Sequence, residues 1–442
     1  MKPFTFLLLT VLTSAVFSNA QTFDRDKLDS LLSYVETNQK SMGSLAILQD
    51  GKVVYKRAIG YANVAGQGKA NAATRYGIGS ISKTFTAVLT LQLAEDGKLS
   101  LDNTLDQYFP TLPNADSITI EQLLQHRSGL HNFTDDVDYM EKMEEPMARE
   151  ALLEWFVEKG VDFAPDEQMK YSNTGYVVLS FILEEASGKS YAELLQERIA
   201  SPCGLKDTYM PAEVVGKQER EAFSYQREGE NWTPSTKTHP SIPTGAGAII
   251  STAEDLTTFF HCLFAGKLIS DDHLQEMTKM VDSYGYGIFS IPFYDKTSYG
   301  HTGGIDGFSS VASYFPEEQM GVAYLSNGAV MSNNDLLIGA LSIYFGKPYE
   351  FPEFKQAIAV NAEELKIYEG NYTSDVVPLD IKVFVEGETL KAQATGQGAF
   401  PLEPFAEHQF QFEPAKIEIE FIPKENKLIL RQGGEYEFTK EQ

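Results

Sequence analysis

The sequence has few basic residues for its length, and this shortage limits the partners it can have. Its 36 Lys and Arg residues are outnumbered by 62 Asp and Glu residues, which gives a formal net charge of -26. A chain this acidic is repelled by nucleic acid and by anionic membrane surfaces. We therefore expect neither as a partner.

Cysteine is also scarce, since only Cys203 and Cys262 occur. The two thiols could pair in an oxidising compartment. Both lie in apolar stretches of sequence, at 202–205 and 259–263, and a free cysteine commonly behaves as a small buried apolar side chain. Two buried free thiols are the expectation, with a disulfide as the alternative.

Several catalytic signatures are missing. No G-x-S-x-G occurs, which argues against the strand-to-helix elbow of α/β-hydrolases. Neither H-E-x-x-H nor H-x-H occurs, so no metal site is predicted, and no cofactor is expected. His126 and His131 are five residues apart, and packing at a helix end is expected for them in preference to metal binding.

Only one apolar run resembles a targeting segment. Met1-Lys2-Pro3 precedes the run from Phe4 to Phe17, and small residues follow at 18–20. This order is typical of a secretory signal peptide, and the run is short for a membrane anchor. We expect residues 1–20 to be removed, the protein to be exported to the periplasm or the extracellular space, and no stable membrane insertion after cleavage.

The pattern of apolar residues in the remaining chain predicts two domains. In residues 21–348, helices are expected at 25–39, 119–126, 175–199 and 336–345, and strands at 44–49, 52–55, 284–291, 298–303 and 307–325. The acidic stretch 135–150 is expected to be a partly mobile, helical insertion. Because strands at both ends enclose a helical middle, the predicted fold class is α+β, an antiparallel sheet flanked by helices with an inserted helical subdomain.

After Pro348 the sequence changes to short alternating strands separated by turn residues. Strands are expected at 368–372, 379–384, 389–394, 408–412, 417–422 and 428–431. Residues 349–442 are therefore predicted to form a separate small all-β domain, either a barrel or a sandwich.

The first candidate catalytic motif is Ser80-Ile81-Ser82-Lys83, at the start of an apolar-periodic stretch that ends near Asp96-Gly97. Residues three apart on a helix are neighbours, so the Lys83 amine would lie beside the Ser80 hydroxyl and ease removal of its proton. The helix N-terminus would favour an anion there. In the alternative interpretation Ser80 is a helix cap and Lys83 a solvated lysine, but no other Ser has a Lys three residues later.

The second candidate motif is Tyr171-Ser172-Asn173. A phenol here could take the Ser80 proton if a nearby ammonium lowers its pKa, and the Asn173 amide could hold a substrate carbonyl. The segment 61–63 matches the same pattern. The order of the motifs along the chain favours Tyr171 over Tyr61.

The third candidate motif is His301-Thr302-Gly303-Gly304, inside a strand-like run. A strand edge with small residues can bind an acyl group by strand addition. The backbone N–H groups of Gly304 and Ser80 could then form an oxyanion hole. Taken alone, the same four residues are more typical of a turn.

In these motifs and their order, the sequence resembles the serine β-lactamase and penicillin-binding protein family, in the branch of class C β-lactamases, D-Ala-D-Ala carboxypeptidases, D-aminopeptidases and esterases. The segments 123–130, 171–176, 186–189 and 247–256 also look like family segments, and the resemblance covers about residues 45–345. It implies the following roles: acylated nucleophile, Ser80; electrostatic partner or base, Lys83; shared acid and base, Tyr171; substrate ligand, Asn173; orienting strand, His301, Thr302 and Gly303.

The resemblance implies an exported serine hydrolase that acts on an amide, ester or lactam of a small molecule or peptide. No S-D-N triplet occurs, and the third motif begins with His301 where relatives carry Lys or His. A fixed cation for a β-lactam carboxylate is therefore missing, which favours a D-amino-acid peptidase or esterase over an efficient β-lactamase. The alternative is a non-catalytic, penicillin-binding-like protein that binds cell-wall-type ligands.

Overall fold

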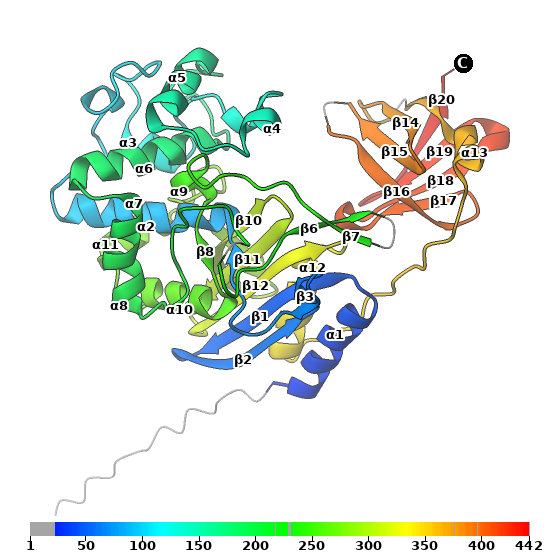
Figure 1. Ribbon diagram of the computed structural model, residues 1–442, viewed down its shortest axis with the longest axis horizontal. Coiled ribbons are helices and arrows are strands. Elements are labelled where there is room, and N and C mark those ends of the chain that lie inside the picture. Colours follow the sequence, from blue (N-terminus) through cyan, green and yellow to red (C-terminus); the bar gives the residue numbers. More distant parts are fainter. Residues whose placement is uncertain (1–22, 217, 229–230, 375, 396, 442) are drawn as a thin grey trace, which may run out of the picture.

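The computed structural model describes residues 23–441, except 217, 229–230, 375 and 396. The predicted signal peptide, residues 1–20, lies outside the described residues. A large body of helices and strands is followed by a smaller β-barrel (Figure 1). Within the described ranges, no helix has both the length and the apolar composition that a membrane crossing requires.

A six-stranded antiparallel sheet forms the centre of the large body, in the order β2-β1-β12-β11-β10-β9. Its strands come from both sides of the helical middle, as predicted. They are β1 (Ser41–Gln49), β2 (Lys52–Ile59), β9 (Phe289–Phe293), β10 (Lys296–Ile305), β11 (Phe308–Phe315) and β12 (Met320–Ala329).

Both faces of this sheet are buried, because successive side chains of a strand point to opposite faces. Leu45 and Ile47 of β1 pack in one apolar cluster with α1 (Arg25–Thr37) and α12 (Asn333–Tyr344). Ala46 and Leu48 of the same strand belong to the second cluster, which includes the helical middle. The predicted α+β class with helices on both faces is confirmed.

The helical middle surrounds α2 (Ser82–Glu95), which is buried on all sides from Ser82 to Leu93. Its hydroxyl groups find acceptors there, since Thr84 donates to the Gly287 carbonyl at 2.6 Å and Thr86 to that of Gly245 at 2.7 Å. The other helices are α3 (Ile120–Leu124), α4 (Tyr139–Lys142), α5 (Arg149–Lys159), α6 (Asn173–Ser187), α7 (Tyr191–Leu195), α8 (Ser201–Cys203), α9 (Thr244–Gly247), α10 (Ala253–Phe264) and α11 (Asp271–Thr278).

Two predicted segments differ from the structure. The strand expected at 284–291 begins only at Phe289, because the chain turns at Gly287 with φ at +65°. The acidic stretch 135–150 contains α4 and the start of α5, which agrees with the predicted helical insertion, but part of it is buried. It is tied to the body through Met143, which is 3% exposed and whose carbonyl accepts the His239 N–H at 2.8 Å.

The other Y-x-N segment, Tyr61–Asn63, has a structural role in a short hairpin. The strand β3 (Tyr61–Asn63) pairs with β4 (Gly68–Lys69) in a hairpin. The Asn63 side chain accepts the Gly66 N–H at 2.8 Å, so it stabilises the turn. The remaining short pairs are β5 (Tyr76–Gly77) with β8 (Ile250–Ser251), and β6 (Tyr225–Glu228) with β7 (Asn231–Pro234).

Cys203 and Cys262 form a disulfide, so the expectation of two free thiols is wrong. Cys262 is buried, as its apolar surroundings indicated. The packing of α8 against α10 brings the two Cα atoms to 6.0 Å although 59 positions separate them in sequence. That distance lies within the usual range for a disulfide.

The C-terminal strands form a closed eight-stranded barrel, which decides between the predicted barrel and sandwich. Apolar side chains such as Ile419, Phe421 and Phe438 fill its own core. Two strands were not expected, β16 with two prolines and the charge-rich β20, which closes the barrel against β13. The strands are β13 (Gly370–Thr373), β14 (Ile381–Glu386), β15 (Thr389–Ala394), β16 (Phe400–Ala406), β17 (Gln409–Phe412), β18 (Ile417–Ile422), β19 (Lys427–Arg431) and β20 (Glu435–Lys440).

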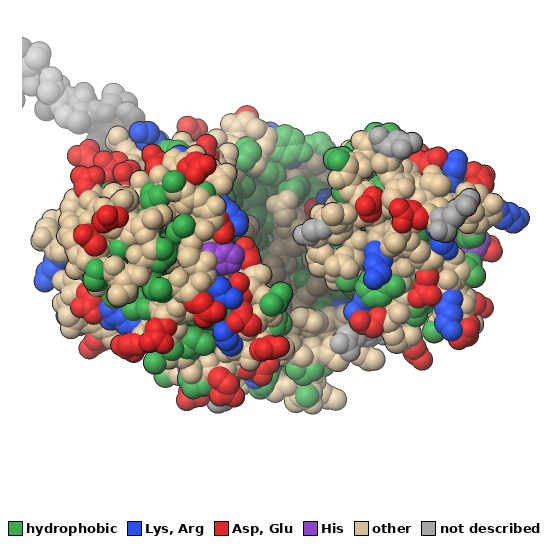
Figure 2. Space-filling view, turned by 90° about the horizontal axis from the view of Figure 1, so that it is seen from above, with side chains coloured by type: hydrophobic (Ala, Val, Ile, Leu, Met, Phe, Trp, Pro, Cys, Tyr) green, Lys and Arg blue, Asp and Glu red, His purple; other side chains and the backbone are tan. Residues whose placement is uncertain are grey.

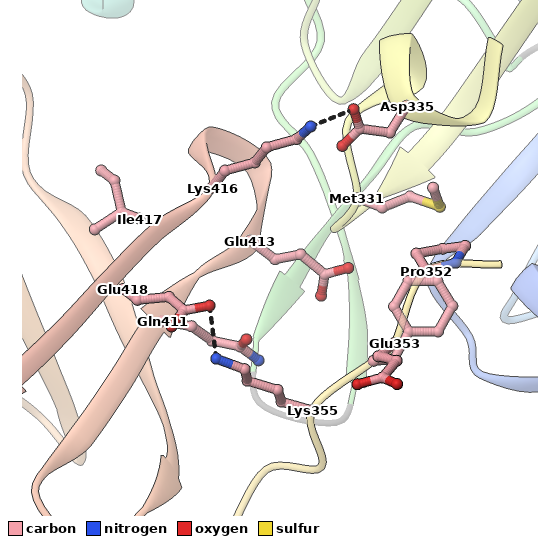
Figure 3. Close-up of a pocket in the computed structure, with 11 residues that line it drawn as sticks. Met331, Asp335, Pro352, Glu353, Lys355, Gln411, Glu413, Lys416, Ile417 and Glu418 are labelled. Atoms are coloured by element: carbon pink, nitrogen blue, oxygen red, sulfur yellow. Dashed lines mark ion pairs between the residues drawn. The ribbon is translucent and has the colours of Figure 1, made fainter. Parts of the chain in front are cut away.

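Charged side chains line the junction between the barrel and the large body. Ion pairs between described residues join them, Lys40 with Glu413 at 2.7 Å and Asp335 with Lys416 at 2.6 Å. A pocket of about 260 Å³ lies beside these residues (Figure 3). The surface is hollowed between the body and the barrel (Figure 2).

Candidate active site

Ser80 lies on a tight turn that leads directly into α2. A 3₁₀ turn spans Gly79–Ile81, and Gly79 adopts a left-handed φ of +51°. The preceding residue, Ile78, is held on both sides, because its N–H donates to the Ile249 carbonyl at 3.0 Å and its carbonyl accepts the Ser310 hydroxyl at 2.8 Å. The hydroxyl of Ser80 is thus presented from a fixed backbone at the start of a buried helix.

Lys83 is fully buried beside this hydroxyl. Its Nζ lies 3.0 Å from Ser80 Oγ, 2.7 Å from Asn173 Oδ1 and 2.8 Å from the Ala246 carbonyl. Burial lowers the pKa of Lys83 well below its ordinary value. The alternative of a solvated lysine is therefore wrong.

The three neighbours of the Lys83 nitrogen differ in what they can donate. The oxygens of Asn173 and Ala246 can only accept, whereas the Ser80 hydroxyl can donate or accept. A neutral amine has two hydrogens and one lone pair, so both hydrogens can go to the two carbonyl oxygens. The lone pair then faces the Ser80 hydroxyl, which is the arrangement that a base requires.

Tyr171 lies against the same pair of residues. The Lys83 nitrogen is 4.8 Å from the centre of its ring. Burial raises the pKa of the Tyr171 phenol, and a hydrogen bond with Ser80 lowers it by less. The expectation that a nearby ammonium lowers this pKa overall is wrong, because desolvation outweighs the other effects.

Asn173 is the first residue of α6, and both its side-chain oxygen and its side-chain nitrogen form hydrogen bonds. Its Oδ1 accepts from Lys83, while its Nδ2 donates to Thr134 Oγ1 at 3.0 Å. Its backbone N–H donates to Asn132 Oδ1 at 2.8 Å. Asn132 and Thr134 were not identified from the sequence, because they belong to no motif and reach the site only through the fold.

The third motif occupies the C-terminal half of β10. His301 is 1% exposed, and Tyr284 Oη lies 3.1 Å from its Nε2. Its Nδ1 contacts the Thr302 carbonyl, which can only accept, so Nδ1 carries the hydrogen and the Tyr284 hydroxyl donates to Nε2. Burial lowers the pKa of His301 to about 3, so the ring is neutral near pH 7.

The edge of β10 beside Ser80 is open for part of its length. Among the described strands, β9 pairs with β10 only from Lys296 to Gly300, and residues 301–305 continue beyond that pairing. Thr302 and Gly304 are exposed there. An extended substrate backbone can therefore lie along this edge.

The backbones of the first and third motifs are in close contact. A Cβ placed on Gly303 would lie 2.0 Å from the Ile78 carbonyl oxygen and 3.0 Å from the Ser80 nitrogen, and one on Gly79 would lie 2.7 Å from the Gly304 nitrogen. Only glycine permits this approach. It brings the backbone nitrogens of Ser80 and Gly304 into one region.

Arg127, which lies between the first and second motifs in sequence, does not supply a free cation. Its Nε donates to Asp166 at 2.6 Å, and its Nη1 pairs with Asp282. Two carboxylates thus neutralise its charge. Within the described residues, no group of three or more His, Cys, Asp or Glu side chains is arranged to hold a metal.

A model of the beta-lactamase family matches residues 33–341, which include the residues of all three motifs. The chain belongs to the beta-lactamase family. Its assignment as a serine hydrolase of this family is confirmed by its similarity to hydrolases from other organisms.

Among the relatives of this beta-lactamase family member, penicillin-binding protein 4* of Bacillus subtilis is 25% identical over 93% of this chain and 98% of its own. Teichoic acid D-alanine hydrolase of Staphylococcus aureus is 26% identical over 59% of this chain and 65% of its own. The crystal structure of D-amino acid amidase from Ochrobactrum anthropi superposes with a TM-score of 0.65 at 25% identity, over 73% of this chain and 98% of that one.

Proposed function

We propose that this protein is an exported hydrolase that cleaves amides or esters of D-amino acids in small molecules or short peptides, through an acyl-enzyme on Ser80. The contact that carries the proposal is the one between Lys83 Nζ and Ser80 Oγ, at 3.0 Å, inside a site where two carbonyl oxygens occupy the other positions around the amine.

Acylation begins with transfer of the Ser80 proton to the neutral amine of Lys83. The Ser80 oxygen then attacks the substrate carbonyl carbon, and the carbonyl oxygen becomes an oxyanion beside the backbone N–H groups of Ser80 and Gly304. Thr302 and Gly303 hold the substrate along the edge of β10, and Asn173 lies beside the acyl group.

Tyr171 supplies the proton that the leaving group needs. Because burial keeps its phenol protonated, it can donate to the departing amine or alkoxide, and the Lys83 ammonium returns a proton to the phenolate. The acyl-Ser80 ester forms as the old bond breaks. Attack of water on that ester, with its proton passing to the same pair, releases the acid and restores Ser80.

The charge states of His301 and Arg127 support the choice of substrate class. His301 is neutral and Arg127 is paired with two carboxylates, so a substrate carboxylate gains no charge-assisted hydrogen bond from them. The relatives named as a D-amino acid amidase and a teichoic acid D-alanine hydrolase act on D-amino acid derivatives by their names. Both considerations favour uncharged D-aminoacyl amides and esters over β-lactams.

Export is supported by two independent features. The sequence begins with the pattern expected of a signal peptide, and the disulfide between Cys203 and Cys262 is a bond that persists mainly in oxidising compartments.

Covalent labelling tests the proposal. A fluorophosphonate should add one phosphonyl group to the intact protein, as measured by mass spectrometry, and Ser80→Ala should abolish the adduct. Replacing the exposed Ser290 by Ala serves as the control and should leave labelling unchanged. Undiminished labelling of Ser80→Ala would refute the role of Ser80, and equal turnover of D- and L-alanine p-nitroanilide would refute the stereochemical part.

A further inference from the structure

His126 holds the backbone on both sides of Tyr171. Its carbonyl accepts the Lys170 N–H at 3.0 Å, and its ring Nδ1 accepts the Ser172 N–H at 3.1 Å. One residue thus binds the residue before and the residue after the candidate proton donor. A bond at each side restricts both translation and rotation of the intervening tyrosine.

The ring of His126 also covers the face of the tyrosine. The ring centres of His126 and Tyr171 are 4.2 Å apart, and those of Tyr284 and Tyr176 lie 4.7 and 5.0 Å from His126. The histidine is 2% exposed. It therefore lies in a packed aromatic group that includes Tyr171.

The tautomer of His126 follows from its contacts. Because Nδ1 accepts a backbone N–H, the ring hydrogen must be on Nε2, and within the described residues this buried atom has no hydrogen-bond partner. Burial, with Lys83 and His301 nearby, lowers the pKa of His126 well below its ordinary value. The ring is thus neutral, and among the described residues it accepts a hydrogen bond from the Ser172 N–H alone.

The backbone of His126 has a conformation that few residues adopt without strain. Its φ is +57°, in the left-handed region that is uncommon for residues other than glycine, asparagine, aspartate and histidine. It directly follows the end of α3, and this turn directs both the carbonyl and the ring toward the segment of Tyr171. The packing role at a helix end that the sequence indicated is correct but incomplete.

We propose that His126 is a positioning residue for Tyr171, which keeps the phenol oxygen at Ser80 by holding residues 170 and 172 and by packing on the tyrosine ring. This inference rests on the proposed function, because it needs Tyr171 to transfer a proton. A displacement of about 1 Å in a reacting group can cost on the order of 10²-fold in rate. The positioning role therefore predicts that substitution of His126 lowers kcat only when Tyr171 is present.

The test is a double-mutant cycle between His126 and Tyr171, with active sites counted by fluorophosphonate titration. The substrate is a short alkyl ester, because its alkoxide leaving group needs a proton whereas p-nitrophenolate does not. His126→Phe keeps an aromatic ring but removes the acceptor for Ser172. It should lower kcat by about 10- to 100-fold with KM nearly unchanged. In the Tyr171→Phe background the same substitution should cost less than about threefold.

His126→Asn is the second variant, because its Oδ1 can accept the Ser172 N–H and asparagine tolerates a positive φ. It should recover part of the loss in kcat, and it replaces His126→Phe in the cycle if that variant does not fold. An unchanged kcat in both variants, or the same fold-loss with and without Tyr171, would overturn the positioning role. If Tyr171→Phe itself retains full kcat, the proton-transfer role of Tyr171 fails, and the role of His126 fails with it.

Discussion

At the scale of single residues, the proposed mechanism depends on the protonation state of Lys83. The amine must be neutral to take a proton, and a lowered pKa means that it becomes neutral at a lower pH than an exposed lysine. The value of kcat/KM for a p-nitrophenyl ester should rise with pH and level off well below about 10.4, the ordinary lysine value. A pH profile whose rising limb is centred near about 10 would contradict the role of Lys83 as base.

Lys83→Arg separates the charge of the lysine from its basicity. A guanidinium stays protonated at every pH at which the enzyme is folded, so it keeps the cation and removes the base. We expect a loss of at least about 10²-fold in kcat/KM across the profile. Lys98→Arg, at an exposed position, is the matched control and should leave kcat/KM unchanged.

His301 allows a second residue-scale prediction. An ordinary histidine becomes cationic below about pH 6.5, which would improve the binding of a substrate carboxylate in mild acid. His301 has a pKa of about 3, so it stays neutral above that value. The ratio of kcat/KM for a chromogenic cephalosporin to that for the ester should therefore not increase between about pH 7.5 and about pH 5.

The control for this measurement is His301→Lys, which introduces an amine into the same strand. A missing charge-assisted bond is worth about 1.5 to 3 kcal/mol, or roughly ten- to a hundredfold. The cephalosporin-to-ester ratio should rise in this variant. A wild-type enzyme that hydrolyses the cephalosporin near the diffusional limit would refute the interpretation of His301 as a missing cation.

At the scale of structural elements, the contact between the Ser80 turn and β10 depends on Gly303. An alanine there would place its Cβ 2.0 Å from the Ile78 oxygen and 2.5 Å from Ser310 Oγ, so the two elements must separate. Forced overpacking of this kind costs about 1 to 3 kcal/mol. Gly303→Ala should lower the Tm and slow labelling of Ser80.

Gly304→Ala is the matched control, because the nearest atom to its added Cβ is 4.0 Å away. Both variants keep every backbone N–H group. The Tm of Gly304→Ala should stay near that of the wild type, as thermal unfolding followed by circular dichroism would show. Equal changes in Tm for the two variants would mean that the close approach of these elements does not limit stability.

At the scale of the whole molecule, the residues that follow α12 pack against the large body before the barrel begins. Phe354 stacks on Tyr34 with ring centres 5.3 Å apart, and Lys27 Nζ donates to the Tyr349 carbonyl at 2.9 Å. A chain that ends at 348, the predicted boundary, would expose Tyr34 and part of the face of α1. A chain that ends at 356 would keep these contacts.

We expect residues 21–356 to fold and to hydrolyse a small ester within a fewfold of the full chain, because the barrel pairs with the body through Lys40 and Asp335, which are not candidate site residues. Residues 21–348 should have a Tm about 1 to 2 °C lower, in line with the loss of an aromatic pair worth about 1 kcal/mol. Measurements of Tm and of ester hydrolysis on both truncated chains check this. A folded but inactive 21–356 chain would show that the barrel contributes to the reaction.

Local patterns were sufficient for much of the fold and for the first motif. Ser80 and Lys83 are three residues apart on one helical turn, so their proximity is a property of the chain itself. The central strands could likewise be predicted from alternation and from Asp50-Gly51, although β12 continues past the predicted end at 325 and is buried along its length except at Ala329. By contrast, β16 and β20 become strands only because barrel closure supplies partners for sequences with proline or many charges.

The sequence by itself determined which residues are candidates for catalysis and the order in which they occur, because the identity of a side chain and its near neighbours are local. Only the tertiary structure decided which of them meet and in which protonation state. Asn173 and the Ala246 carbonyl reach Lys83 from distant segments, and α8 brings Cys203 to Cys262. The pKa of Tyr171 is raised because its side chain is buried. Burial depends on residues from many parts of the fold, so no single motif predicts it.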